Sequence, residues 1–177
     1  MRRIEGIATG VVKEIDAEHA CVKLDFPWMS ASYRSNWAPV AAPMSGGKRG
    51  MFMMPELDDE VLVAFDRCNI EHPYVVGFLW NGPDNPPETT NKNRVIVTPG
   101  GHTLRFEDTD DKKKVFLRSS AGHEIAFDDT SDGQTITVVM KKTKAQIVLK
   151  DEGANGSIKL DGGGRKLELK DNKVQIS

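Results

Sequence analysis

The stretch Gly122–Thr130, GHEIAFDDT, nearly repeats Gly101–Thr109, GHTLRFEDT, 21 residues earlier in the chain. Both segments carry a Gly-His pair, two apolar residues separated by one variable residue, and an acidic end. Apolar residues two positions apart are typical of a β-strand, because alternate side chains of a strand point to the same face. The repeat therefore predicts short strands that follow one another with similar turns between them.

Apolar pairs of the same kind continue to the C-terminus, with 7 to 11 residues from one pair to the next. The segments between them are rich in Asp, Asn, Gly and Ser, which favour turns. One short strand and one polar turn per period indicate a repeat architecture. The pairs are Leu104 and Phe106, Val115 and Leu117, Ile125 and Phe127, Ile136 and Val138, Ile147 and Leu149, Ile158 and Leu160, Leu167 and Leu169, and Val174 and Ile176.

These strands have only one apolar face, because neighbouring residues such as Arg105, Glu124 and Lys159 are polar. Burying two side chains per strand contributes on the order of 3–6 kcal/mol. Ordering the five backbone residues of that strand costs roughly 5–10 kcal/mol. We therefore expect several copies, and favour three, to wrap around a common axis with the apolar pairs from Leu104 to Leu169 as the core of a homotrimer. The alternative is a two-sheet sandwich made by a single chain.

The N-terminal region also reads as β-structure, because it contains short runs rich in β-branched and aromatic residues that end at Gly, Pro or Asp. These runs are IATGVVKEID, ACVKLDF, WAPVAAP, GMFMMP, DEVLVAFD and PYVVGFLW. Five or six strands in this length fit a small closed barrel. The sequence thus predicts an all-β chain with a barrel at residues 1–80, a linker or ordered strap at 81–94, and the strand repeats at 95–177.

Composition narrows the function classes. The net charge of −2 argues against a surface built to neutralise phosphates, so no nucleic-acid partner is expected. The N-terminus lacks the apolar segment of a signal peptide, and no run of about 18 apolar residues occurs, so synthesis in the cytoplasm without a cleaved signal is expected. Cys21 and Cys68 do not form a disulfide framework and fit small buried side chains.

Several motifs of Phe26–Pro87, in this order, resemble the OB-fold core of the VgrG and phage baseplate assembly protein V family, the central spike of contractile injection systems. The strand repeats are similar to the triple-stranded β-helix that follows in this family. The motifs are FPW at Phe26–Trp28, SNWA at Ser35–Ala38, GGKRG at Gly46–Gly50, PELDDEVLVAF at Pro55–Phe65, HPYVVG at His72–Gly77 and LWNG at Leu79–Gly82.

Two positions depart from the family pattern. Asp58 stands where the family usually has Gly, and Asp tolerates the left-handed backbone region better than most residues. Pro39 stands where a basic residue is common, and an edge strand would tolerate it best. We expect the fold to accommodate both.

The resemblance implies a non-enzymatic, trimeric spike at the front of an inner tube and baseplate, which pierces a target envelope and touches its membrane transiently. It implies a separate trimeric hub at the barrel end and a small PAAR-type tip protein at the other end, bound by Val174, Gln175, Ile176 and Ser177. The chain is expected to be a short form without hub or lysozyme domain. It would be assembled into a virion tail or injection particle and delivered outside the cell or into the target envelope.

Catalytic and metal sites find little support in the motifs. The segment Ser45–Arg49 lacks the first Gly and the hydroxyl residue of a phosphate-binding loop, and the acidic cluster Glu56–Glu60 fits a solvated turn. No cofactor is expected. His102 and His123 each precede an apolar position by two residues, so in a trimer each could form a metal-binding ring or pack between turns.

Two other functions remain open. An OB-fold nucleic-acid-binding protein would need a basic groove with exposed stacking aromatics, for which Trp28, Tyr33 and Trp37 are candidates. A trimeric receptor-binding fibre would end in a distinct globular tip. The choice among phage, phage-derived particle and cellular secretion system is left open.

Overall fold

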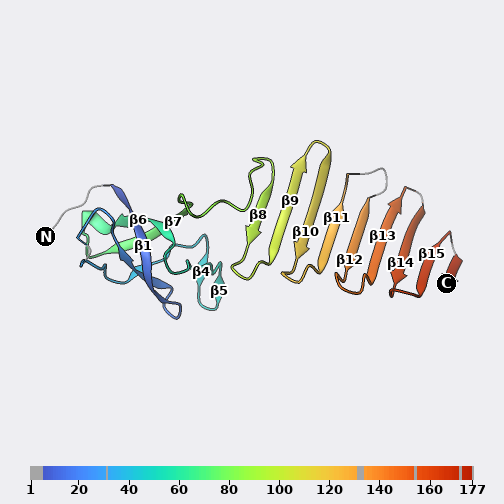
Figure 1. Cartoon of the computed structure of the whole chain (residues 1–177), viewed down its shortest axis with the longest axis horizontal. Coiled ribbons are helices and arrows are strands. Elements are labelled where there is room, and N and C mark those ends of the chain that lie inside the picture. The colour runs from blue at the N-terminus through green and yellow to red at the C-terminus, as the bar shows by residue number, and fades with distance from the viewer. Residues whose placement is uncertain (1–5, 31, 131–133, 154, 172, 177) are drawn as a thin grey trace. The chain divides into compact units, whose positions relative to one another are not determined.

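The computed structural model describes residues 6–30, 32–130, 134–153, 155–171 and 173–176. The chain divides into two compact units, Met1–Asn85 and Pro86–Ser177, called the barrel unit and the sheet unit below. Figure 1 shows that both are built from strands. The described residues contain no α-helix, so the predicted all-β fold is confirmed.

The barrel unit is a five-stranded antiparallel sheet whose two edges meet. Its strand order is β3-β2-β1-β6-β7. Just after β3, Val40 forms a parallel bridge with Val75 of β7, and the Ala41 amide donates to the Val75 carbonyl at 2.8 Å, which closes the sheet into a barrel. The strands are β1 (Ile7–Asp16), β2 (Cys21–Asp25), β3 (Ala38–Pro39), β6 (Glu60–Phe65) and β7 (Pro73–Leu79); a small hairpin, β4 (Ser45–Gly46) and β5 (Arg49–Gly50), and a 3-10 turn, η1 (Asp66–Cys68), lie between them.

Alternation along the strands fills the barrel with apolar side chains. In β6, Val61, Val63 and Phe65 are buried while the residues between them are only half-buried. Gly10 of β1 lies beside the Phe26 ring, where an added Cβ would approach a ring carbon to 3.3 Å. The buried hydrophobic residues of the core are Val12, Val22, Leu24, Phe26, Ala38, Val61, Val63, Phe65, Ile70 and Val75.

The structure tests three predictions for single positions and segments of the barrel unit. Asp58 has a φ of +71°, in the left-handed region, and Pro39 lies on the edge strand β3, as predicted. The expected strand at GMFMMP is wrong, because Met51–Pro55 forms no strand and Met51, Phe52 and Met53 are exposed. The barrel edges already meet at Val40 and Val75, so this segment has no strand edge left to pair with.

The sheet unit is a single antiparallel meander in which each strand pairs with the next along the chain (Figure 1). It is one sheet and not the two packed sheets of a sandwich. The strands are β8 (Arg94–Val97), β9 (Thr103–Thr109), β10 (Lys112–Arg118), β11 (Glu124–Asp128), β12 (Thr135–Val139), β13 (Gln146–Glu152), β14 (Asn155–Asp161), β15 (Lys166–Lys170) and β16 (Lys173–Ile176).

Glu88 anchors the segment that precedes this sheet. Its carboxylate accepts hydrogen bonds from the Thr89 and Thr90 amides at 2.8 and 2.9 Å and from the Asn93 side chain at 3.0 Å. It also pairs with Arg105 of β9 at 2.6 Å. These contacts hold residues 88–93 in a compact loop against β9.

Candidate assembly surface

The register of the meander places apolar residues directly opposite one another on every pair of neighbouring strands from β9 to β16. Residues directly opposite share a face of the sheet. They form two continuous rows on one face. The Phe106 row is Phe106, Val115, Phe127, Ile136, Leu149, Ile158, Leu169 and Val174; the Leu104 row is Ile96, Leu104, Leu117, Ile125, Val138, Ile147, Leu160, Leu167 and Ile176.

This apolar face is uncovered in the single chain. Ile125, Phe127 and Ile147 expose 40, 45 and 41% of their surface, whereas the barrel core is at most 8% exposed. Among the described residues of the sheet unit, no hydrophobic side chain belongs to a buried core cluster. A contiguous exposed apolar surface of this length marks an interaction surface.

Two hollows lie on the apolar face. One, of about 570 Å³, is lined by Phe127, Ile136, Leu149 and Ile158 of the Phe106 row. The other, of about 460 Å³, is lined by Val138, Ile147, Leu160, Leu167 and Ile176 of the Leu104 row. Both are open grooves between apolar side chains, which side chains of another sheet can fill.

The opposite face of the sheet is mostly polar, although Phe116, Ala126 and Val148 also lie on it, and it carries ion pairs between neighbouring strands. Lys114 contacts Asp128 and Arg118 contacts Glu124, each at 2.6 Å across the β10–β11 pair. The Arg118 guanidinium also lies over the Phe116 ring, 4.7 Å from its centre. Donation from Lys114, and then from the Thr130 amide, lowers the pKa of Asp128 from 3.8 to about 2. Charged pairs of this kind are suited to a solvent-facing surface.

The two predicted histidines lie in equivalent turns. Gly101 and Gly122 adopt φ angles of +81° and +82°, which only glycine adopts readily, and His102 and His123 follow them. His102 Nδ1 accepts from the Ser120 amide, and His123 Nδ1 accepts from the Lys141 amide, both at 3.3 Å. Each imidazole therefore links its turn to the next turn on the same side of the sheet. A metal ring would have to use Nε2 of these residues.

The predicted tip-binding residues lie on β16, the last strand of the sheet. Val174 and Ile176 end the two apolar rows and are 62 and 81% exposed, while Gln175 points to the polar face opposite Glu168. Ser177 lies outside the described residues.

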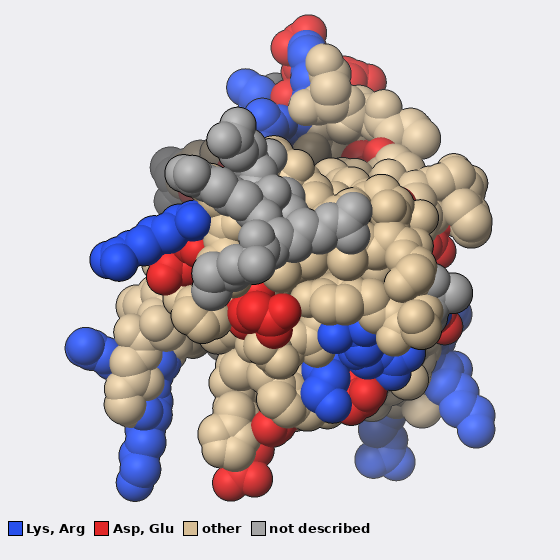
Figure 2. Space-filling model, turned by 90° about the vertical axis from the view of Figure 1, so that its left-hand side faces the viewer, with Lys and Arg blue, Asp and Glu red and all other residues tan. Residues whose placement is uncertain are grey.

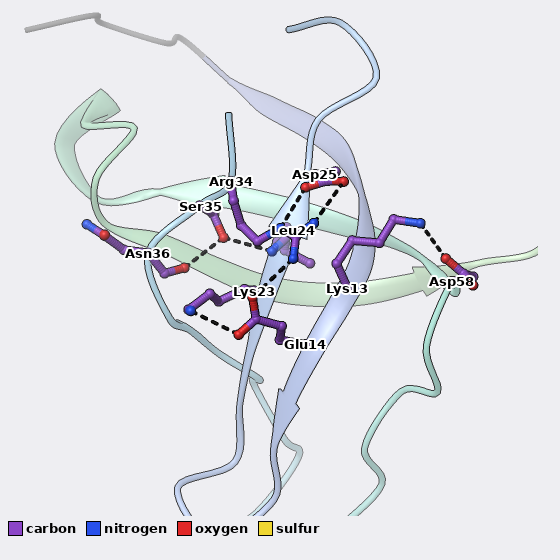
Figure 3. Close-up of polar contacts among 9 residues, drawn as sticks. All are labelled: Lys13, Glu14, Lys23, Leu24, Asp25, Arg34, Ser35, Asn36 and Asp58. Atoms are coloured by element: carbon purple, nitrogen blue, oxygen red, sulfur yellow. Dashed lines mark hydrogen bonds and ion pairs between the residues drawn. The ribbon is translucent and has the colours of Figure 1, made fainter. Parts of the chain in front are cut away.

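In the barrel unit, a network of charged and polar side chains fixes the SNWA motif (Figure 3). Arg34 pairs with Asp25 at 2.9 Å and with Glu14 at 3.0 Å, and Glu14 also pairs with Lys23 at 2.9 Å. Donation from Lys23, and then from Arg34, lowers the pKa of the Glu14 carboxyl. These charges neutralise one another and leave no obvious ligand site.

The candidate stacking aromatics are already engaged within the barrel. Trp28 Nε1 donates to the Thr9 carbonyl at 3.2 Å, Tyr33 stacks on the Phe26 ring at 6.1 Å, and Lys23 lies over Trp37 at 4.7 Å. In the view onto the barrel side, basic and acidic residues are interspersed around a largely uncharged surface (Figure 2). A nucleic-acid groove would instead need a continuous basic stripe with free aromatics.

Sequence reasoning missed Ile96, which extends the Leu104 row onto β8 opposite Leu104. The run Val95–Val97 has no polar residue at alternate positions, so the alternation of apolar and polar residues that revealed the other pairs is absent there.

The described residues hold no group of three or more His, Cys, Asp or Glu residues that could bind a metal ion. None of their helical segments is long and apolar enough to cross a membrane.

Comparison with known proteins agrees with this architecture. Residues 8–80 match the family model of the type VI secretion system/phage-baseplate injector OB domain. The chain is 27% identical over 114 residues, 58% of its length, to the actin cross-linking toxin VgrG1 of Vibrio cholerae serotype O1, Ogawa strain. It is 26% identical over 110 residues, 55% of its length, to the type VI secretion system spike protein VgrG3 of the El Tor Inaba strain of the same serotype.

These matches cover 10 and 11% of the two relatives, so the chain spans about a tenth of the length of the curated proteins it matches. The actin cross-linking activity in the first name is that of a much larger protein. The barrel unit, which the family model covers almost completely, therefore matches an injector OB domain, and the chain is similar to the two VgrG proteins over 58 and 55% of its length.

Proposed function

We propose that the chain assembles as a homotrimer in which three sheet units wrap around one axis with their apolar rows inside. The observation that carries this proposal is the pair of continuous, exposed apolar rows on one face of an otherwise polar sheet. Burying a side chain such as Phe127, 45% exposed in one chain, stabilises by about 1 kcal/mol, and every strand contributes two such side chains.

Three copies fit this surface best. Each sheet supplies two apolar side chains per strand, so three sheets bring six to the axis at each level. Two sheets face to face would leave the sides of their core open to water, and larger rings would enclose a channel that Leu and Ile side chains do not fill.

We infer a mechanical role for this trimer as the central spike of a contractile injection system. Its three chains share the load, so breaking the needle requires many strand contacts to fail together. Contraction would drive the spike through the target envelope, with the barrel end seated on a trimeric hub. The similarity to an injector OB domain and to a type VI spike protein supports this role, which needs no catalytic residue.

At the other end, β16 offers a binding surface for a tip protein. Its outer edge has no partner strand among the described residues, and unpaired strand edges attract another strand. Val174 and Ile176 add exposed apolar contacts beside this edge. We infer a small PAAR-type protein as the occupant, because the resemblance to the spike family implies one.

A pair of substitutions tests the tip contact. Ile176→Asp places a charge in the apolar surface, and we expect it to abolish co-purification of a co-expressed PAAR-type protein while the trimer mass is unchanged. Gln175→Asp, on the polar face of the same strand, is the matched control and should keep binding. Equal binding by both variants would exclude this surface as the tip site.

A further inference from the structure

The two rows of turns that border the sheet differ in charge. One row, called the His-side turns, joins β8 to β9, β10 to β11, β12 to β13 and β14 to β15 (Figure 1). Its turns contain Lys141, Lys142, Lys144 and Arg165, which are all exposed. Within the described part of the chain none of these four has an acidic partner. The one acidic residue beside them, Asp161, already pairs with Lys166 at 3.3 Å.

The opposite row, called the Asp-side turns, joins β9 to β10, β11 to β12, β13 to β14 and β15 to β16. Asp110 pairs with Lys92 at 3.1 Å, but the other four acidic residues have no basic partner among the residues that the structure describes. The first and last turns of this row also carry the exposed lysines Lys112, Lys113, Lys170 and Lys173, so the acidic excess lies in its two middle turns, at Asp129 and Asp151. By alternation, Lys150 lies on the strand face opposite to Asp151. The exposed acidic residues of the row are Asp110, Asp111, Asp129, Asp151 and Asp171.

The meander sets the heights of these charges along the sheet. Lys142 and Lys144 lie between β12 and β13, Asp129 lies between β11 and β12, and Asp151 is the last residue but one of β13, close to the following turn. Each basic turn is thus one strand above one acidic turn and one strand below the next. When two copies stand side by side at equal height, the lysine turn of one lies between the two acidic turns of the other, about 4.8 Å from each along the axis.

We propose that the His-side turns of one copy dock onto the Asp-side turns of the next copy at equal height, which closes the trimer in one direction and register. This inference deepens the proposed function and rests on it. Such a head-to-tail contact joins two different surfaces and forms a closed ring when its rotation fits three copies. Exposed ion pairs add little affinity, which the apolar rows provide, but opposite charges select the direction and the register.

Disulfide trapping tests the register directly. In the full chain with Cys21→Ala and Cys68→Ala, Lys142→Cys is combined with Asp129→Cys or with Asp151→Cys, and the protein is oxidised under native conditions. We expect a covalent trimer on a non-reducing denaturing gel from at least one of these pairs, because disulfides require Cα atoms within about 7 Å.

The matched control pairs Lys142→Cys with Asp111→Cys, three strands away along the axis, about 14 Å, and should stay uncrosslinked. A second control, Lys142→Cys with Arg165→Cys, places both cysteines in the His-side turns. If light scattering shows a trimer but crosslinks form only through a control pair, or through no pair, the proposed register is wrong while the proposed trimer is supported. A monomer would overturn both.

Charge exchange provides an independent readout. Lys142→Asp with Lys144→Asp places acidic residues in the β12–β13 turn, opposite Asp129 and Asp151 of the next copy. Asp129→Lys with Asp151→Lys places lysines opposite Lys142 and Lys144. Each double substitution should lower the concentration-dependent trimer yield roughly tenfold, and the four substitutions together should restore it. Additive losses in the quadruple variant would contradict the docking of opposite rows.

Discussion

Ser35 shows how one buried hydroxyl organises the start of the barrel. It is 3% exposed, and its Oγ accepts from the Leu24 amide at 2.9 Å and donates to the Asn36 carbonyl at 2.7 Å (Figure 3). The next residue, Asn36, donates from its side chain to the Glu71 carbonyl at 3.0 Å. The motif thus ties β2 to the segment that enters β3 and to the loop before β7.

Replacing Ser35 by Ala would leave the buried Leu24 amide without its side-chain acceptor. An unsatisfied buried donor costs about 1–3 kcal/mol, so Ser35→Ala should lower the free energy of unfolding of the barrel by that amount. All three tryptophans, Trp28, Trp37 and Trp80, lie in the barrel unit, so their fluorescence in a urea titration reports its unfolding. Ser32→Ala, at an exposed hydroxyl, is the control and should change the midpoint little.

The sequence predicted the backbone environment of single residues correctly where the residue type restricts the backbone conformation or hydrogen bonding. Asp58 and Pro39 could be placed because a left-handed φ and a missing amide donor restrict where they fit. The run Met51–Met54 could not, because its apolar side chains resemble a strand and only barrel closure at Val40 and Val75 shows that no partner is left. Local propensity does not report which strand edges are occupied.

At the scale of elements, Glu88 controls the loop that precedes the sheet. Hydrogen bonds from the Thr90 amide, and then from the Asn93 side chain, lower the pKa of its carboxyl from 4.5 to about 2. A lowered pKa in the folded state means that the charged carboxylate stabilises the fold above pH 4.5. That contribution is lost as the pH falls towards about 2.

Glu88→Gln should therefore lower the melting temperature at neutral pH, because Gln keeps the shape but loses the charge and one acceptor oxygen. The difference from the natural chain should shrink as the pH falls from 4.5 to about 2, measured by circular dichroism. Glu18→Gln, at an exposed carboxylate, is the matched control. A difference that does not change with pH in this range would argue against an electrostatic role for Glu88.

The strand elements of the second half could be predicted because each carries the same signal, two apolar residues separated by one. Their pairing could not, since the same pattern permits several registers and either one sheet or two. The observed register aligns the apolar residues of all strands from β9 to β16, and only this alignment shows that Ile96 continues the Leu104 row. The Glu88 loop also escaped prediction, because its contacts join residues without a periodic pattern.

At the scale of the whole molecule, two units of different design are joined in one chain. The barrel has a closed core of its own, and its injector OB domain could be recognised from the order of its motifs. The sheet has an apolar face without a cover among the described residues, which is a physical reason to expect partners. The sequence indicated that the sheet needs a partner, because the apolar residues of each strand lie on one face only. The opposite charges of the two turn rows could be recognised only from the strand order.

We propose that the apolar rows hold three copies of the chain together. The most direct test is the mass in solution by light scattering, in buffer and in dilute detergent, for the natural chain, for Phe127→Asp and for the polar-face control Thr137→Asp. We expect three times the chain mass of 19.6 kDa for the natural chain and for Thr137→Asp, stable in detergent, and loss of the trimer for Phe127→Asp. A monomeric natural chain, or a stable soluble Phe127→Asp trimer, would contradict it.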